Sequence, residues 1–227
     1  MKAAVQGLLA QPGIWLGKEL MRTSQPGLST GFAVLDAELP GGGWPVGGMA
    51  EVLTARHGLG ELSLLLPALA ALTRGGQRVA LVAPPFIPYA PALAAAGVRL
   101  DRLLWVRAEA ALIPWAIEQT LKSGACAAVA GWPVGRLQDK SWRRLQLAAE
   151  AGRSTGFVLR EPGVDEASSP VMLRLALEAR MRLRILKRRG PPLLHPLQLE
   201  KEPCHVVART VLPAPRAGMP ERRLQLA

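Results

Sequence analysis

Residues 54–64 read Thr-Ala-Arg-His-Gly-Leu-Gly-Glu-Leu-Ser-Leu, and this stretch suggests a definite chemistry more clearly than any other in the 227-residue chain. It follows a short apolar run at 49–53 and opens a longer apolar run that ends at Leu72. A strand, a glycine-containing loop and a helix in this order is the arrangement that holds phosphate groups in nucleotide-binding proteins. Loop amides and a helix N-terminus both attract anions. Whether this loop can still bind phosphate depends on the residues at a few fixed positions.

A working phosphate loop has the pattern Gly-x4-Gly-Lys-Ser/Thr, in which the lysine neutralises phosphate charge and the hydroxyl holds Mg²⁺. If Gly60 is the second glycine, Ala55 takes the place of the first, Glu61 that of the lysine and Leu62 that of the hydroxyl residue. A carboxylate beside a polyanion turns attraction into repulsion, and leucine cannot ligate a metal. We therefore expect a degenerate phosphate loop that binds no nucleotide cofactor, with Glu61 as an acid that complements the helix macrodipole.

One alternative to this interpretation is open from the sequence. Arg56 or His57 could hold a nucleotide in another geometry. A metal or thiol chemistry is not supported, because two cysteines and three histidines form no ligand cluster, and the neighbours Cys204 and His205 rarely orient for catalysis. We expect no metal site, no disulfide framework and a reducing cytoplasm.

The elements around the loop alternate between strand and helix patterns. Strands are expected at 49–53, 78–83, 103–106, 125–130 and 156–159, and helices at 61–74, 90–96, 109–122 and 142–151. Because these strands are apolar on both faces, they predict an α/β fold with a doubly wound, mostly parallel sheet and helices on both faces. Such sheets bind ligands at the carboxyl ends of their strands, which is where the 54–64 loop lies.

Side-chain spacing gives the inward faces of two of these helices. In the helix at 109–122 the apolar residues at helical spacing are Leu112, Trp115, Ala116 and Leu121, and in the helix at 142–151 they are Trp142, Leu145 and Ala149.

The chain divides into four parts by composition: an N-terminal arm at 1–27, a core at 28–160, a basic C-terminal extension of the core at 161–202 and a flexible tail at 203–227. The formal net charge is +11, and residues 171–227, with 12 basic and 4 acidic side chains, account for +8 of it. The alternation in 181–187 predicts a half-exposed strand, paired into a hairpin with 193–199.

Such a basic block suggests an anionic partner, either nucleic acid or an acidic protein surface. The alternatives are a solvated, arginine-rich face or a strand whose charges protect the edge of the sheet. The expected phosphate contacts are Arg180, Arg182, Arg184, Lys187, Arg188 and Arg189. Binding by such a block is expected to be steep in salt and indifferent to sequence.

The order of motifs in the first half resembles a RecA core. It comprises Ser29-Thr30-Gly31-Phe32 with Leu35-Asp36, the glycine-rich turn 41–48, Glu51-Val52-Leu53 and the loop and helix that follow, and it continues through 93–104 and 118–124. The resemblance implies a RecA-like fold over about 25–160. RecA-like ATPases carry a glutamate after the next strand and a metal-associated aspartate further on. Here those places hold Ala83-Pro84-Pro85 and Gly131-Trp132, so the resemblance implies no ATPase activity.

A RecA-like core with the stretch 60–69 and a basic C-terminal segment resembles the ImuA family, which is similar in turn to the division inhibitor SulA. The resemblance implies a non-catalytic accessory protein of damage-induced translesion DNA synthesis in the cytoplasm. It would act as an adaptor between RecA and a complex of ImuB with an error-prone polymerase. The alternative is a SulA-like inhibitor that binds FtsZ. Trp15 in the arm is the candidate interface anchor, and no run is apolar and long enough to predict a membrane span or signal peptide.

Overall fold

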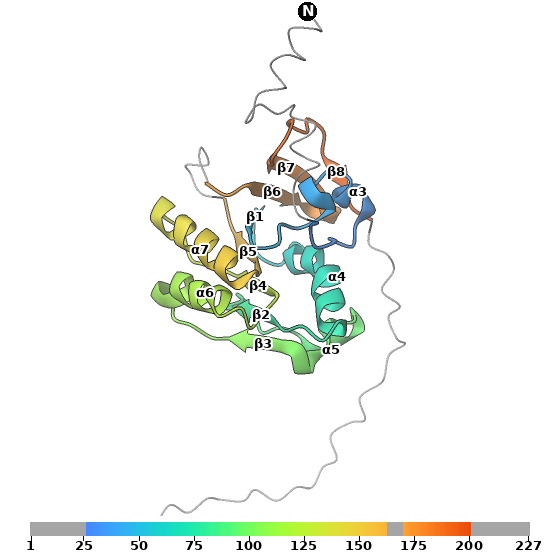
Figure 1. Ribbon diagram of the computed structural model, residues 1–227. Coiled ribbons are helices and arrows are strands. Elements are labelled where there is room, and N and C mark those ends of the chain that lie inside the picture. Colours follow the sequence, from blue (N-terminus) through green and yellow to red (C-terminus); the bar gives the residue numbers. More distant parts are fainter. Residues whose placement is uncertain (1–25, 163–169, 201–227) are drawn as a thin grey trace, which may run out of the picture.

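The computed structural model describes residues 26–162 and 170–200, which form a mixed α/β fold around one sheet of eight strands (Figure 1). The strand order is β3-β2-β4-β5-β1-β6-β7-β8. All pairings are parallel from β3 across to β6, and the last two pairings are antiparallel. The predicted α/β class with a mostly parallel sheet is therefore confirmed. The predictions for the N-terminal arm, the tail and Trp15 concern residues outside the described ranges.

The strands lie close to the expected positions. Their bounds are β1 Met49–Thr54, β2 Val79–Val82, β3 Leu103–Val106, β4 Ala128–Gly131, β5 Thr155–Arg160, β6 Leu173–Glu178, β7 Arg182–Lys187 and β8 Leu197–Gln198. Every residue of β1, β2, β4 and β5 is buried, as expected for parallel strands with helices on both faces. The strand expected at 125–130 begins later, at Ala128.

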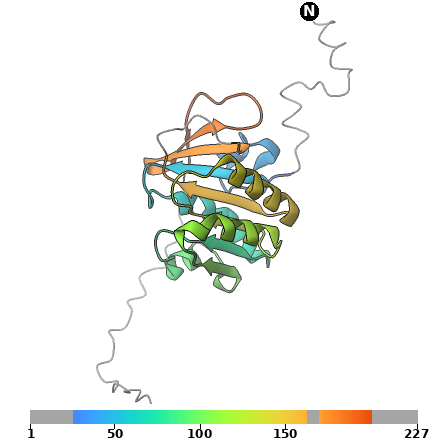
Figure 2. The ribbon, with the colours of Figure 1, turned by 90° about the vertical axis from the view of Figure 1, so that its left-hand side faces the viewer.

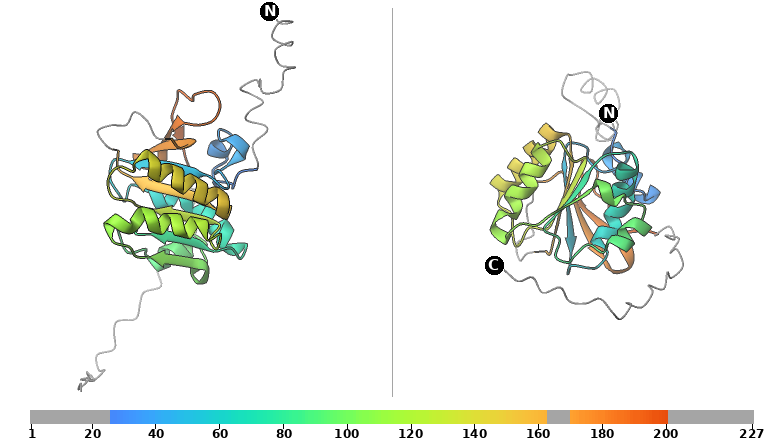
Figure 3. Two further views of the ribbon diagram at one scale, coloured as in Figure 1. Left: turned by 60° about the vertical axis from the view of Figure 1, so that its left-hand side comes forward. Right: turned by 90° about the horizontal axis from the view of Figure 1, so that it is seen from below.

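Helices cover the sheet in two layers (Figure 3). The described α-helices are α3 Ala33–Asp36, α4 Glu61–Arg74, α5 Ala90–Ala95, α6 Ile113–Lys122 and α7 Asp139–Gly152. Those at the start of the chain, α3 to α5, lie on one face, and α6 packs beside α7 on the other. β6 and β7 extend beyond α6 and α7, so none of the described helices lies over that part of the sheet on this side (Figure 2).

The inward face of α6 differs from the expected one. A 3₁₀ turn at Ala110–Leu112 precedes the helix, which starts at Ile113 with a proline in its first turn. The buried residues are Ile113, Ala116, Ile117 and Leu121, whereas Leu112 is 50% and Trp115 56% exposed. Proline fixes where the first helical turn begins. The buried residues form an apolar stripe at spacings of three and four residues that begins at Ile113, one position after Leu112. In α7 the expected Trp142, Leu145 and Ala149 are all buried.

The glycine-rich turn at 40–48 packs the start of the chain against the core. Leu28 and Trp44 exchange backbone hydrogen bonds of 2.9 and 2.7 Å, and the Trp44 ring is fully buried with its centroid 5.1 Å from that of Phe157, edge to face. Gly43 allows this contact, because a Cβ there would lie 2.2 Å from the carbonyl oxygen of Leu28. Trp44 is thus a core residue.

Candidate functional site

The loop between β1 and α4 carries its own anion. Glu61 is the first residue of α4 and only 5% exposed, and its Oε1 accepts a hydrogen bond of 2.8 Å from the backbone N–H of Gly58. Gly58 and Gly60 have positive φ angles, of 86° and 106°, which let the loop fold back over the helix N-terminus. The carboxylate therefore lies inside the turn, bonded to an amide that a phosphate loop would offer to its ligand.

The charge environment of this carboxylate is completed by His57. Its Nδ1 lies 4.0 Å from Glu61 Oε1, close enough for an ion pair when the imidazole is protonated. Glu61 Oε2 and His57 Nδ1 are both buried with no hydrogen-bond partner in the described part of the chain. The predicted role of Glu61 as an acid at the helix N-terminus agrees with this position. Its hydrogen bond to the loop is a feature that the sequence did not indicate.

The other strand ends at this edge of the sheet hold Ala83 after β2 and Trp132 after β4. The Ala83 N–H donates to the carbonyl of Val106 at 2.8 Å, and the Trp132 N–H donates to that of Val82 at 3.2 Å. Ala83 has a φ of 49°, a left-handed conformation that costs a non-glycine residue about 1 kcal/mol. Among the described residues no group of three or more histidine, cysteine or acidic side chains could hold a metal.

A cavity of about 530 Å³ lies at these carboxyl ends. Its polar lining comes from His57, Arg136, Arg160 and Glu161, and prolines and Val134 form part of the rest. Trp132 also lines it and is 5% exposed, with an indole N–H that has no partner in the described chain. The cavity is next to the Glu61 loop because both lie where the parallel strands end.

Behind the cavity, a buried ion triad ties three strands together. Glu51 in the middle of β1 is fully buried. Its Oε1 lies 2.6 Å from Nε of Arg160 on β5, and its Oε2 lies 3.0 Å from Nε of Arg174 on β6. The contact with Arg174 is an ion pair whose geometry does not meet that of a hydrogen bond. Sequence reasoning missed this triad. The available signal was one acidic residue inside an otherwise apolar strand, which requires a buried cation nearby.

The six basic residues expected to contact phosphate do not form one free surface. Arg182 and Arg184 project from the outer side of β7 and share Glu178, with N–O distances of 3.6 and 2.7 Å. Arg180 sits in a turn with a φ of 58° and is exposed. Lys187 and Arg189 are exposed as well.

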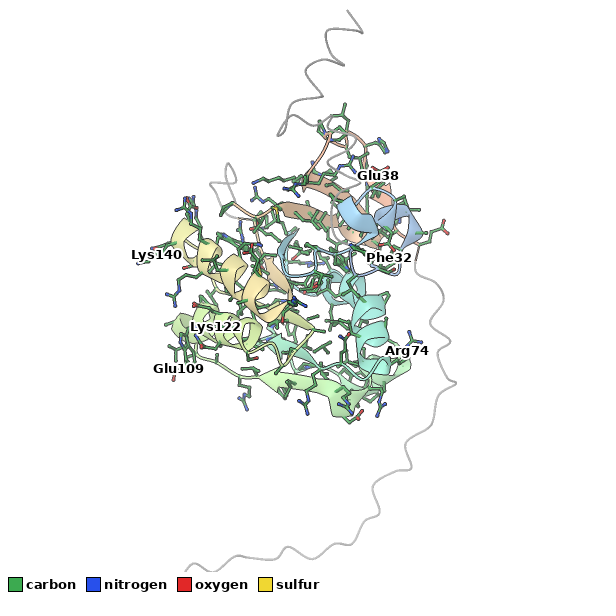
Figure 4. All side chains as sticks on the ribbon, viewed as in Figure 1. Phe32, Glu38, Arg74, Glu109, Lys122 and Lys140 are labelled. Atoms are coloured by element: carbon green, nitrogen blue, oxygen red, sulfur yellow. The ribbon has the colours of Figure 1, made fainter. Side chains whose placement is uncertain are left out.

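Arg188 differs from the rest of this block. Its side chain is 6% exposed, with Nη1 2.7 Å from Oε2 of Glu38 and Nε donating to the carbonyl of Pro191 at 2.9 Å. Glu38 lies just after α3 (Figure 4), so the pair ties the end of β7 to the start of the described chain. Arg188 is thus engaged in a structural ion pair, and its contact with phosphate stays a prediction.

The chain was compared with known families, curated proteins and solved structures. No family model matches it. Protein ImuA from two strains of Caulobacter vibrioides is 36% identical over 145 residues, which cover 61% of this chain and 59% of the relative. The chain thus spans about 59% of the length of the curated relatives it matches. The crystal structure of SulA from Pseudomonas aeruginosa overlays with a TM-score of 0.43 at 25% identity, covering 50% of this chain and 98% of that one.

The SulA overlay is too weak to establish a shared fold, so the sequence match has to identify the relatives. That match confirms the resemblance inferred from the ordered motifs around the Glu61 loop. Over the 145 matched residues, this chain is a homologue of Protein ImuA.

Proposed function

We propose that this chain is a non-catalytic, RecA-like accessory protein of damage-induced translesion DNA synthesis. It would act as an adaptor that links or modulates RecA and a complex of ImuB with an error-prone polymerase. Homology to Protein ImuA supports the process. The strand order with a loop and helix after β1 supports the RecA-like interpretation.

The observation that carries the proposal is the place of Glu61. A nucleotide phosphate would have to displace a buried carboxylate from a 2.8 Å hydrogen bond to the loop amide of Gly58, and would then lie beside a negative charge. A charge-assisted hydrogen bond contributes about 1.5–3 kcal/mol, and repulsion between like charges adds to that cost. The protein therefore uses the loop to stabilise its own fold and not to bind nucleotide.

The neighbouring strand ends support the same conclusion. Phosphoryl transfer needs a metal ion, charge neutralisation and a group that positions the nucleophile. The ends of β2 and β4 present Ala83 and Trp132, whose side chains supply none of these. We propose that the protein uses no cofactor, has no ATPase activity and works in the cytoplasm beside the nucleoid.

A RecA-like subunit without ATPase chemistry can still use the shape of the fold. Subunits of that kind assemble through heterologous contacts, one face of a protomer meeting a different face of the next. A non-catalytic subunit can occupy one such position and present ImuB to it. The basic block of 180–189 would add a DNA contact, weakened because Arg182 and Arg184 share one carboxylate.

The test is capture of the purified protein on RecA filaments formed on single-stranded DNA. A matched variant ends at Glu200, after β8, because Leu197 and Leu199 belong to the core and must be kept. Capture of both proteins supports a RecA contact on the folded core, and capture of the full chain alone places the contact in the tail.

Two further arms separate the alternatives. Calorimetric titration with Mg-ATP is expected to show no binding, and measurable binding would contradict the role given to Glu61. Failure of both proteins to bind RecA, together with inhibition of FtsZ sedimentation, would replace the adaptor proposal with the SulA-like one.

A further inference from the structure

A second concentration of positive charge lies at the opposite edge of the sheet from the Glu61 loop. Arg78 immediately precedes β2, Arg102 immediately precedes β3, and Arg153 is two residues before β5. Because these strands are parallel neighbours around β4, their amino ends meet at the same edge. The three arginines line one polar hollow of about 390 Å³, together with residues of the turns at 76–77 and 124–127 and with Gly152.

The lining of this hollow contains three guanidinium groups and no carboxylate. The nearest acid on the same turn is Asp101, whose Oδ2 lies 2.8 Å from Arg99 and 3.6 Å from Arg102. The hydrogen bond from Arg99 lowers the pKa of Asp101, so this carboxyl is already ionised and paired. One acid therefore offsets two arginines here, and the hollow retains a positive excess.

The positive charge continues on both sides of the sheet. Arg74 ends α4 on one face, and Lys122 ends α6 on the other (Figure 4). The nearby acid Glu150, on the last turn of α7, accepts a hydrogen bond of 2.8 Å from Gln146, four residues back along the helix. The basic side chains at this edge therefore extend beyond the hollow toward both faces of the sheet.

Helix electrostatics explains part of this charge. The carboxyl ends of α4, α6 and α7 lie at this edge, and Arg74, Lys122 and Arg153 are placed to complement their dipoles. Arg78 precedes a strand and Arg102 ends the short 3₁₀ turn Leu100–Arg102, so the dipole of no α-helix accounts for either. Like charges gathered in one hollow repel each other, and a bound anion would relieve that repulsion.

We propose that this amino edge binds the phosphodiester backbone of nucleic acid. Adjacent strands are about 4.8 Å apart, so Arg102, Arg78 and Arg153 extend over three strand intervals, or about 14 Å. A row of that length, with Arg74 and Lys122 on the two faces beside it, matches a chain of phosphates better than a single phosphate group. No aromatic ring lines the hollow, so the contact provides no stacking platform and is indifferent to base sequence.

The experiment measures the affinity of the full chain for a labelled single-stranded oligonucleotide of mixed sequence by fluorescence anisotropy. The test protein carries Arg78→Gln, Arg102→Gln and Arg153→Gln. The matched control carries Arg180→Gln, Arg182→Gln and Arg184→Gln, which remove the same charge from the far end of the sheet.

The edge variant is expected to bind about 100-fold more weakly at 0.1 M salt. Each lost phosphate contact lowers the slope of log K against log salt by about 0.7, so three contacts lower it by about 2. The control is expected to lose far less affinity, because Glu178 already neutralises part of its charge. Equal losses in the two variants, or no loss in the edge variant, would overturn the proposal.

Two more measurements test the proposal if the triple variant does not fold or if the hollow binds small phosphates. If the triple variant does not fold, as judged by circular dichroism, Arg78→Gln alone is expected to weaken binding about fivefold with an unchanged melting temperature. Pyrophosphate at constant ionic strength is expected to displace little DNA. Full displacement at low concentration would show a site for small phosphates and refute the backbone track. None of these assays contains RecA or ImuB, so their result is independent of the adaptor proposal.

Discussion

Replacing Glu51 by glutamine tests whether the buried triad holds the sheet together. The side chain is fully buried between Arg160 and Arg174, which are each 8% exposed, and the substitution removes its charge without changing its shape. Two guanidinium groups would then be left in the interior with no counter-ion supplied by β1. Loss of one partner from a buried ion pair costs about 3–5 kcal/mol.

For a chain of this size each kcal/mol corresponds to about 2–4 °C in melting temperature, so Glu51→Gln is expected to lower it by about 6–20 °C. The assay is thermal and urea unfolding followed by circular dichroism. The matched control is Glu118→Gln, which removes an ion pair of 2.7 Å with an Arg144 that is 53% exposed. Exposed pairs contribute less than about 1 kcal/mol. If both variants lose equally little stability, the triad does not hold the strands, and the argument from burial is refuted.

Three further predictions follow from single contacts. Glu61→Ala should lower the free energy of unfolding by about 1.5–3 kcal/mol in urea, because it leaves a loop amide unbonded, and Glu61→Gln should recover part of this loss. Gly31→Ala should lower the free energy of unfolding by about 2–4 kcal/mol, because the φ of 82° is strained for alanine and the new Cβ would lie 2.3 Å from Cβ of Pro67. The control Gly42→Ala, whose Cβ would have nothing within 4 Å, should lower it by only about 1 kcal/mol, and equal losses would contradict the clash. Burial raises the pKa of the Cys126 thiol, so with the other cysteine replaced, native protein should react slowly with a thiol reagent up to about pH 9, and its stability should fall as pH rises above the ordinary thiol pKa; fast labelling would contradict this.

Local sequence patterns predicted the strands and helices well where the residues are continuously buried. The four central parallel strands are buried throughout and mostly apolar, and the amphipathic spacing of 142–151 gave the correct inward face of α7. The same reasoning failed for α6, because apolar residues there form two overlapping stripes, and the sheet buries the one that begins at Ile113. Trp115, placed in the core from the sequence, is 56% exposed.

The candidate sites also contain features that the sequence predicts and contacts that it does not. The loss of a phosphate-loop lysine and hydroxyl could be read directly from Glu61 and Leu62, because the motif is contiguous in the chain. The basic block of 180–189 could be located, but not the fact that Arg188 is committed to Glu38, 150 residues away in sequence.

The sequence by itself determined the fold class and the relatives, and it predicts the absence of nucleotide chemistry, because each is carried by residue types at short and fixed spacing. Only the tertiary structure decided that Glu61 accepts a hydrogen bond from the N–H of Gly58, that Glu51 joins β1 to Arg160 and Arg174, and that Arg78, Arg102 and Arg153 share one hollow. Parallel strands bring together residues separated by a whole crossover helix. Contacts across such a sheet depend on strand order, which no local pattern in the chain encodes.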